Sequence, residues 1–373
     1  MRGPDAGHGT PITSVMTSMI DGVIDGVIDG VMAARHAVGM SLLVTRLAET
    51  PMIHAALNDR MNSPDIVNIN GPSVVRMPDW APGRLGTYHM YFGHHKGHYI
   101  RLAYADDLAG PWQVYDPGVL DLADSLFEPV NPTPSPDAVP PYWADDLGEY
   151  LYAHIASPDV HIDHDARCLH MYYHGLLYDG DQQTRYAVSR DGLHFSPQAP
   201  LLGGPYFRAI TWDGMIYAID WDGAMYRAPQ WAGPFTRLPW GVPAHMSRTG
   251  RDDDGVLHRM RHPHLYVHQG RIHMCFTRIG DAPEALFHAE LFPPPSAANT
   301  DAAWQFGPVR EILRAAPGWE GGDLPVAPSA IGTAMGRVNQ LRDPVLFAAK
   351  ERLYLAYCGG GESGIGIASV TGL

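Results

Sequence analysis

The 373-residue sequence contains only three cysteines (Cys168, Cys275 and Cys358) and only two lysines (Lys96 and Lys350). The cysteines lack metal-ligand spacing and lie in short apolar runs, so we expect buried free thiols in a reducing compartment. No stretch is long and apolar enough to span a membrane, and the N-terminus lacks the charged-then-apolar order of a secretory signal. We therefore expect a soluble, cytoplasmic protein without a membrane partner.

Arginine carries nearly all the positive charge, and the formal net charge is −14. This acidity disfavours nucleic acid or an anionic membrane as a partner. Arginine offers a planar fork of donors that suits carboxylates, sulfates and sugar hydroxyls. A GC-rich coding bias would explain the same preference for arginine.

The first fifty residues differ from the rest of the chain. Residues 19–32 read MIDGVIDGVIDGVM, a four-residue unit repeated about three times. We expect residues 1–50 to form an N-terminal extension that is poorly ordered or partly helical. Residues 51–373 are then expected to form a single domain.

A long-period repeat begins near residue 60, and 40 glycines and 33 prolines act as turn punctuation typical of an all-β fold. Each unit has a turn, an apolar strand and a second strand of alternating aromatics. The units begin NGPSVVRM (70–77), SPDVHID (157–163), PYFRAIT (205–211), HPHLYVH (262–268) and DPVLFAA (343–349). Five antiparallel meanders predict a five-bladed β-propeller of four-stranded blades, starting near residues 70, 157, 205, 262 and 343.

The fifth unit ends at Leu373 after its third strand. We expect residues near 52–68 to supply its outer strand and close the ring. Two proline-rich insertions are expected at about 118–152 and 292–340, and insertions of that length are often functional.

Propeller geometry predicts which polar residues share one mouth of the central channel. Strand starts and the loops between second and third strands lie at the same end of each blade. The predicted strand starts are Asn70, Asp159, Arg208, His262 and Asp343. The loops add His94, His95, Lys96, His174, Arg185, Asp220, Arg278, Glu284 and Glu362. Such a polar funnel is where a binding site is expected.

The segments SPDVHID and LRDPVLF, followed by strands such as HMYYHG and LYLAYCG, resemble blade starts of five-bladed glycoside hydrolases. The families are the arabinanase/xylosidase family 43, the invertase-type family 32 and the neoagarobiose-hydrolase family. The segment GPWQVY, after AYADDLA, is similar to an outer-strand edge common in these enzymes. The resemblance covers residues 60–373 and implies a carbohydrate substrate and carboxylate acid/base catalysis.

The resemblance also implies roles for particular residues. In family 43 an Asp at the first blade start is the general base, a second Asp tunes pKa values, and a Glu is the general acid. Asp159 matches the second Asp, whereas Asn70 and Gly71 stand where the base is expected. Asp343, in the adjoining fifth blade, is the substitute candidate for the base. Both Asp159 and Asp343 could instead cap turns before inner strands.

Two glutamates are candidates for the general acid, which needs a raised pKa beside apolar walls. Glu320, in PGWEGGDLP, follows Trp319, which could stack on a sugar, and Glu362 lies in GGGESG. Glu320 could equally be an ordinary loop carboxylate. The hydrolase hypothesis requires Asp159, Asp343 and one of Glu320, Glu362 or Glu284 to converge in one pocket.

Several histidines lie in the repeats, but we expect no metal ligands and no cofactor. His161 and His170 occupy alternating strand positions and fit packing better than ligation. The resemblance leaves open a structural metal ion on the propeller axis, with His262 as one ligand.

The leading hypothesis is a glycoside hydrolase that acts on a small oligosaccharide. An acidic or sulfated sugar is suggested by Lys96, Arg185, Arg208, Arg261, Arg278 and Arg342 around the funnel. These arginines could instead pair with neighbouring Asp residues and tie blades together. The alternative function is a non-catalytic propeller that binds a glycan or another acidic ligand.

Overall fold

The computed structural model describes residues 1, 42–61, 67–133, 151–243, 246, 250–251, 257–294, 302–334 and 336–373. The chain divides into two units, Met1–Leu43 with Gly372–Leu373, and Val44–Thr371. The expected character of the N-terminal extension concerns mainly residues 2–41, which lie outside the described residues. The second unit contains the propeller.

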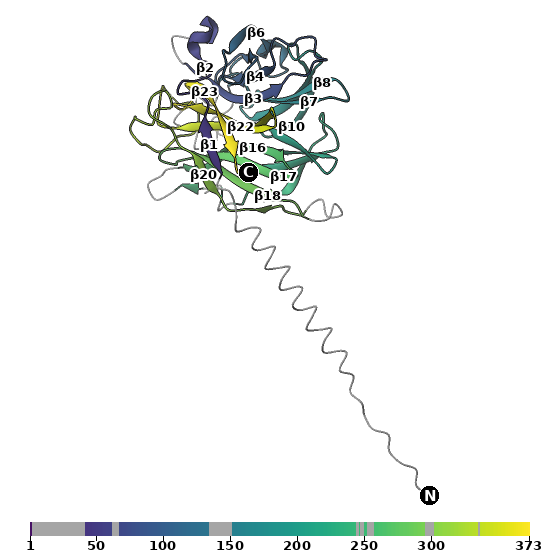
Figure 1. Ribbon diagram of the computed structural model, residues 1–373. Coiled ribbons are helices and arrows are strands. Elements are labelled where there is room, and N and C mark those ends of the chain that lie inside the picture. The colour runs from purple at the N-terminus through teal and green to yellow at the C-terminus, as the bar shows by residue number, and fades with distance from the viewer. Residues whose placement is uncertain are drawn as a thin grey trace. The chain divides into compact units, whose positions relative to one another are not determined.

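Five antiparallel sheets form the blades, as expected (Figure 1). Blade one contains β3 (Asn70–Arg76), β4 (Tyr88–Gly93), β5 (Tyr99–Ala105) and β6 (Gln113–Asp121). Blade two contains β7 (Ile155–Asp163), β8 (Cys168–Leu176), β9 (Gln182–Ser189) and β10 (Ser196–Gly203). Blade three contains β11 (Arg208–Trp212), β12 (Met215–Ile219), β13 (Ala224–Ala228) and β14 (Thr236–Gly241).

Blade four contains β16 (Leu257–His268), β17 (Arg271–Ile279) and β18 (Leu286–Phe292), with the short β15 (Gly250–Arg251), β19 (Gln305–Phe306) and β20 (Arg310–Leu313). Blade five contains β21 (Leu341–Ala349), β22 (Arg352–Gly359) and β23 (Gly364–Thr371). Three 3-10 turns complete the elements: η1 (Ala55–Leu57), η2 (Asp59–Met61) and η3 (Leu122–Asp124). The inner strand β21 of blade five contacts β3 of blade one, which closes the ring.

The outer edge of blade five is built from two N-terminal strands, β1 (Leu43–Arg46) and β2 (Ile53–His54), both of which pair with β23. The first and last strands of the chain therefore lie side by side (Figure 1). Among the described residues of the expected closing segment, 52–68, β2 is the only strand, and β1 already pairs with β23 before residue 51. Strand β1 is held against blade five because the Arg46 guanidinium donates hydrogen bonds to Glu320 Oε1 and Oε2 at 2.7 and 2.6 Å.

The two expected insertions are also shorter than the sequence indicates. Strand β6 continues to Asp121, so the first insertion starts after that residue rather than near 118. In the second, β19 and β20 both pair with β18 and form the outer edge of blade four. Short outer strands carry a weak sequence signal because they lie at a sheet edge and are half exposed.

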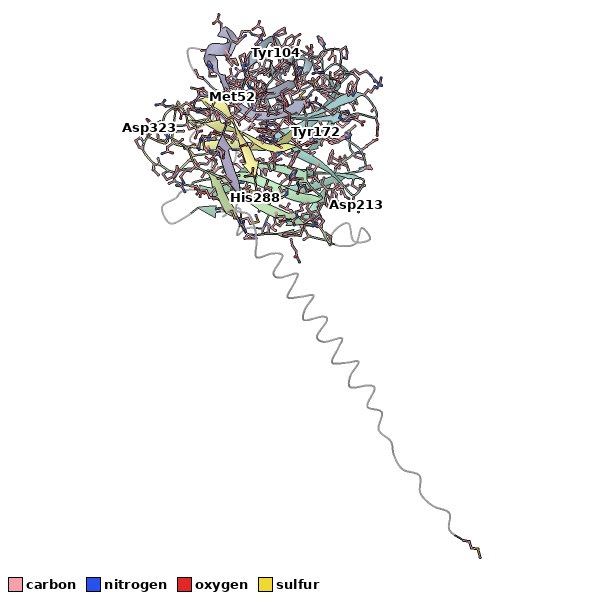
Figure 2. All side chains as sticks on the ribbon, viewed as in Figure 1. Met52, Tyr104, Tyr172, Asp213, His288 and Asp323 are labelled. Atoms are coloured by element: carbon pink, nitrogen blue, oxygen red, sulfur yellow. The ribbon has the colours of Figure 1, made fainter. Side chains whose placement is uncertain are left out.

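Apolar side chains fill the spaces between the blades. Separate clusters join blade one to blades five and two, blade two to blade three, and blade three to blade four. Tyr172, fully buried, lies inside this body, whereas Asp213 lies at the exposed β11–β12 turn (Figure 2). No such cluster among the described residues joins blades four and five, where buried ion pairs take its place.

The three cysteines are free and buried, as expected from their apolar surroundings. In the part of the chain that the structure describes, no helix has the length and apolarity needed to cross a membrane.

Ring closure generates a stability prediction. Glu320 is fully buried, and besides Arg46 it accepts hydrogen bonds from the Tyr357 hydroxyl and the Ala316 amide, each at 2.7 Å. We expect Arg46→Met to lower the free energy of unfolding by about 3 kcal/mol, because it leaves a buried carboxylate without its cation. Chemical denaturation measures this loss.

The control is Glu311→Gln, which breaks the half-exposed pair of Glu311 with Arg314. Its expected cost is below about 1 kcal/mol. Equal losses in the two variants would contradict the role of Arg46 in closure.

Candidate functional site

A cavity of about 430 Å³ lies where the five inner strands begin. Side chains from every blade line it, including Asn70, His95, His154, Ser157, His174, Asp181, Tyr206, Asp220, Asp222, Tyr226, Arg237, Arg259, Arg261, His262, Asp343 and Glu362. The strand starts and the loops between second and third strands therefore meet at one mouth, as the propeller geometry predicts.

One backbone feature recurs at the start of each inner strand. A residue with positive φ occupies the same place in every blade: Gly71, Ser157, Tyr206, His262 and Asp343. In all but the third blade a proline follows, and the pairing register shifts there. Left-handed backbone at residues other than glycine costs free energy, and such positions concentrate at binding and active sites. The four of these residues that have a side chain, Ser157, Tyr206, His262 and Asp343, all line the cavity.

Gly71 is the exception in this ring because it has no side chain. A Cβ atom at this position would lie 2.9 Å from Ser157 Cα. The first blade therefore has no room for a carboxylate at the position where the resemblance to family 43 implies the general base.

Asp343 is the carboxyl group best placed for chemistry. It is 2% exposed, and its Oδ1 accepts a hydrogen bond from the Tyr206 hydroxyl at 2.8 Å. Its Oδ2 has no hydrogen-bond partner among the described residues. Burial and the nearby Glu362 carboxylate raise the pKa of Asp343. This group is thus favoured in its protonated form, with one oxygen uncommitted.

Glu362 is also buried, but its partners favour the opposite protonation state. Arg342 Nη1 donates to Oε1 at 2.8 Å, the Asn68 amide donates to Oε2, and His95 Nδ1 lies 3.9 Å from Oε2. Burial alone would raise the pKa of Glu362, but Arg342 and His95 hold it below its usual range. Glu362 is therefore ionised and cannot be the general acid.

Asp220, in the β12–β13 loop of blade three, is the third buried carboxyl group of the cavity. The Ala224 amide donates to Oδ1 and the Tyr226 hydroxyl donates to Oδ2, each at 2.9 Å. Burial raises the pKa of Asp220 to about 6, and the bond from Tyr226 opposes that shift. Asp220 and Asp343 come from blades that are not neighbours, yet both line the cavity.

Two histidines of the cavity are neutral. Burial lowers the pKa values of His174 and His262 well below the usual range. No group of three or more His, Cys, Asp or Glu side chains in the described part of the chain could hold a metal ion. The expectation that no cofactor takes part stays a prediction.

The structure brings eight of the predicted residues to the cavity: Asn70, His95, His174, Asp220, Arg261, His262, Asp343 and Glu362. Ten others do not line it: Asp159, Glu284, Glu320, His94, Lys96, Arg185, Arg208, Arg278, Trp319 and Arg342. Asp343 and Glu362 line the same cavity but Asp159 does not, so the set of carboxyl groups that the sequence-based hydrolase hypothesis required is wrong. Hydrolysis in this cavity would need a different set.

Asp159 lies two residues beyond the recurrent positive-φ position, so matching it with Asp343 was wrong. It lines a second cavity, of about 320 Å³, further along the inner strands. Its Oδ2 accepts from the Ala209 amide at 2.8 Å and from His161 Nε2 at 2.7 Å. Asp159 thus links the inner strand of blade two to that of blade three.

Equivalent residues make similar links between other blades. Ser73 Oγ accepts from the Val160 amide at 2.9 Å, and His264 Nε2 lies 3.1 Å from the Leu346 carbonyl oxygen. At these positions the inner strand pairs with its own sheet on one side, so its other edge needs such partners. Where a blade carries a polar residue at the position of Ser73, Asp159 or His264, that residue links neighbouring inner strands and has a structural role.

Glu320 and Trp319 lie away from the cavity, contrary to the expectation. All the hydrogen bonds of Glu320 serve the closure of blade five. Trp319 stacks on Tyr357 with ring centroids 6.1 Å apart. These residues pack the insertion against the blade, and a catalytic role is ruled out by their position.

Of the six cations expected around the funnel, Arg261 lines the cavity and the other five do not. Arg208 and Arg342 are fully buried in contacts with acidic side chains, whereas Arg185 and Arg278 lie over Phe127 and Phe287. Lys96 lies over the Tyr152 ring, and the His94 ring nitrogen Nδ1 accepts from the Lys96 amide. The side chains that do line the cavity include five carboxyl groups and three guanidinium groups.

Sequence reasoning missed Tyr206 and Ser157, and it placed Asp220 at the mouth without giving it a catalytic role. The X-Pro pairs at the blade starts were the available signal. Aligning Gly71, Ser157, His262 and Asp343 on the prolines that follow them would have identified the ring of cavity residues.

The fold and site define a five-bladed β-propeller with a carboxyl-rich cavity at one mouth of its channel. No protein-family model matches the chain. The chain belongs to the same family as the uncharacterized protein R118 of Acanthamoeba polyphaga mimivirus, with which it shares 31% identity over 342 residues, 87% of this chain and 89% of that protein.

Solved structures that are similar to the chain include two family 43 glycoside hydrolases and an arabinanase. A GH43 β-xylosidase/α-arabinofuranosidase from a compost microbial metagenome, in complex with xylotriose, shows 12% identity over 88% of this chain and 94% of that chain, with a TM-score of 0.49. The Cellvibrio cellulosa α-L-arabinanase complexed with arabinohexaose shows 11% identity over 82% and 91%, with a TM-score of 0.46. A GH43_1 enzyme from Xanthomonas citri shows 13% identity over 87% and 90%, with a TM-score of 0.48.

The structural role of Asp159 generates a pH-dependent prediction. His161 and Arg208 overcome the effect of burial and lower the pKa of Asp159 to about 2. A lowered pKa in the folded state adds stability that is present above the unfolded pKa and is lost as the pH falls toward about 2. We expect Asp159→Asn to lower the free energy of unfolding by about 2 kcal/mol at neutral pH.

Urea denaturation of both proteins across the acid range measures this difference. The gap between wild type and Asp159→Asn should narrow as the pH falls below the usual Asp range. A gap that stays constant would contradict the assignment of Asp159 as an ionised link between blades.

Proposed function

We propose that the protein is a glycoside hydrolase that cleaves a small, neutral oligosaccharide in the cavity, with Asp343 as the general acid. The observation that carries the proposal is the state of Asp343. It is a buried carboxyl group with a raised pKa, one oxygen held by Tyr206 and the other uncommitted. A group of this kind can donate a proton to a glycosidic oxygen.

Asp220 is the general base of the proposed reaction. Its pKa of about 6 leaves it ionised at neutral pH, and its oxygens are oriented by Tyr226 and the Ala224 amide. Because Asp220 and Asp343 belong to blades that are not neighbours, a sugar ring and a water molecule can lie between them. This arrangement supports the inverting mechanism.

The step balances as a hydrolysis. Asp343 gives its proton to the glycosidic oxygen as the bond from that oxygen to the anomeric carbon breaks. Asp220 takes a proton from the water whose oxygen forms the new bond on the opposite face of the ring. Glu362 stays ionised beside Asp343, and its negative charge favours the protonated acid. Proton exchange with solvent restores both carboxyl groups.

The charge of the cavity supports a neutral sugar rather than the acidic or sulfated one expected from the sequence. Arg261 is paired with Glu284, and Arg259 is paired with Asp222. Two of the three guanidinium groups of the lining are thus paired, with Arg237 as the third, and five carboxyl groups line the cavity, so an anionic substrate would meet repulsion. Hydroxyl groups can bond to the acidic and imidazole side chains without that penalty.

The first test is activity. Wild-type protein is assayed against aryl glycosides of neutral pentoses and hexoses, with sulfated oligosaccharides as comparison substrates. We expect Asp343→Asn to lower kcat by about 10²–10⁴-fold, because the acid is lost while its shape is kept. Unchanged activity in this variant would contradict the assignment.

Asp213→Asn is the matched control. Asp213 has a positive φ of 48° in an exposed turn, and Asn tolerates that conformation. Its activity should equal that of the wild type.

The second test is the pH profile. Because the base must be ionised, kcat/KM should fall below about pH 6, the pKa of Asp220. Tyr226→Phe removes a bond that lowers this pKa, so the acidic limb should move to higher pH. A limb that does not move would exclude Asp220 as the titrating group.

Gly71 supports a second candidate, a propeller that binds a glycan without cleaving it. The blade-one position is closed to any side chain, so the resemblance to family 43 lacks its base there. Calorimetric binding of an oligosaccharide that stays intact, with equal affinity in Asp343→Asn, would favour this function over hydrolysis.

A further inference from the structure

Arg208 is a buried cation at the start of β11 that touches residues of both cavities. It has no solvent exposure, and its Nη1 donates to the Pro158 carbonyl oxygen at 2.6 Å. The same nitrogen lies 3.6 Å from Asp159 Oδ1. Its Nε and Nη2 atoms have no hydrogen-bond partner among the described residues. A desolvated guanidinium needs a partner for its charge nearby.

The neighbour on its other side is Tyr206. The Arg208 Cζ atom lies 4.4 Å from the centroid of the Tyr206 ring. Tyr206 has a φ of 64°, and its hydroxyl is the donor to Asp343 Oδ1. Stacking of the guanidinium on the ring therefore holds a side chain whose backbone is in a costly conformation.

We propose that Arg208 is a positioning residue that sets the protonation of Asp343, by holding the Tyr206 hydroxyl in place and by its own charge, which Asp159 partly offsets. The effect of Arg208 on catalysis rests on the proposed role of Asp343 as general acid. The coupling itself does not depend on hydrolysis: it links Asp159, Arg208, Tyr206 and Asp343 across three blades.

The other groups that face Asp343 do not replace Arg208 in this role. They are His262 from blade four and Arg342, Cys358 and Glu362 from blade five. His262 is neutral, and burial keeps the Cys358 thiol protonated. Arg342 is bound to Glu362 and Gln340 and lies near Glu284. Arg208 is the cation that acts on Asp343 from the opposite side of the channel.

The coupling predicts pKa changes of opposite sign. Arg208→Met keeps the length of the side chain but removes the charge and the stacking, so the pKa of Asp343 should rise by on the order of one pH unit. Asp159→Asn removes a negative charge and leaves Arg208 less compensated, so the pKa of Asp343 should fall. Loss of stability alone would not move the pKa in two directions.

The measurement is a carboxyl ¹³C NMR titration of protein labelled at aspartate. The Asp343 signal is identified by its absence in Asp343→Asn. Where a substrate has been found, the basic limb of the kcat/KM profile should move in the same direction as the NMR value. An inactive protein would still give the titration, so failure of the proposed function can be told from failure of the coupling.

Ser73→Ala is the matched control, because Ser73 makes the equivalent link between blades one and two. It should lower stability and leave the pKa of Asp343 unchanged. The proposal is overturned if Arg208→Met leaves that pKa unchanged or if Ser73→Ala moves it equally. Should Arg208→Met not fold, Asp159→Asn decides alone, and an unchanged or raised pKa of Asp343 overturns the coupling.

Discussion

A row of buried ion pairs between blades four and five is the interaction on which the site depends. Arg261 binds Glu284, Arg342 lies 3.7 Å from Glu284 and 2.8 Å from Glu362, and Glu362 accepts from Asn68 just before blade one. Each charge is desolvated, and only the alternation of sign along the row makes the arrangement stable. The row also leaves an ionised carboxylate beside Asp343, which disfavours a second negative charge there. The ion pairs between blades four and five therefore also influence the protonation of Asp343 in the cavity.

The inner strands explain why an aspartate in a family-like motif turned out to be structural. Each inner strand is hydrogen-bonded to its sheet on one side, and its other backbone edge faces the next blade. Ser73, Asp159 and His264 satisfy groups on that edge in three different blades. Unpaired buried backbone groups are costly, so a polar residue at this position is retained for the ring itself. In blades two and four the residue two places earlier, Ser157 or His262, lines the cavity.

The cavity departs from the arrangement that the family resemblance implies. Gly71 closes the first blade to a carboxylate, while Asp220 and Tyr226 add a buried acidic group from the third blade. This chain thus combines a five-bladed propeller with buried carboxyl groups from its third and fifth blades. Fold and site are separate properties, because function resides in side chains grafted on a common framework.

Periodicity determined the fold from the sequence alone. Alternating strands and turn residues recur five times, and each such unit can bury its faces only against a neighbouring copy, which leaves a closed propeller. The sequence also placed Asn70, His95, His174, His262, Asp343 and Glu362 at one mouth, since strand direction is regular. Tertiary structure decided the rest. The residue with positive φ, which lies two places before Asp159, lines the cavity, so Asp159 itself lies outside the site. Long-range contacts pair Glu320 with Arg46 and Arg342 with Glu362. A local sequence pattern does not show which distant charged group will contact a side chain. The pKa shifts of these groups are therefore set only when the blades pack together.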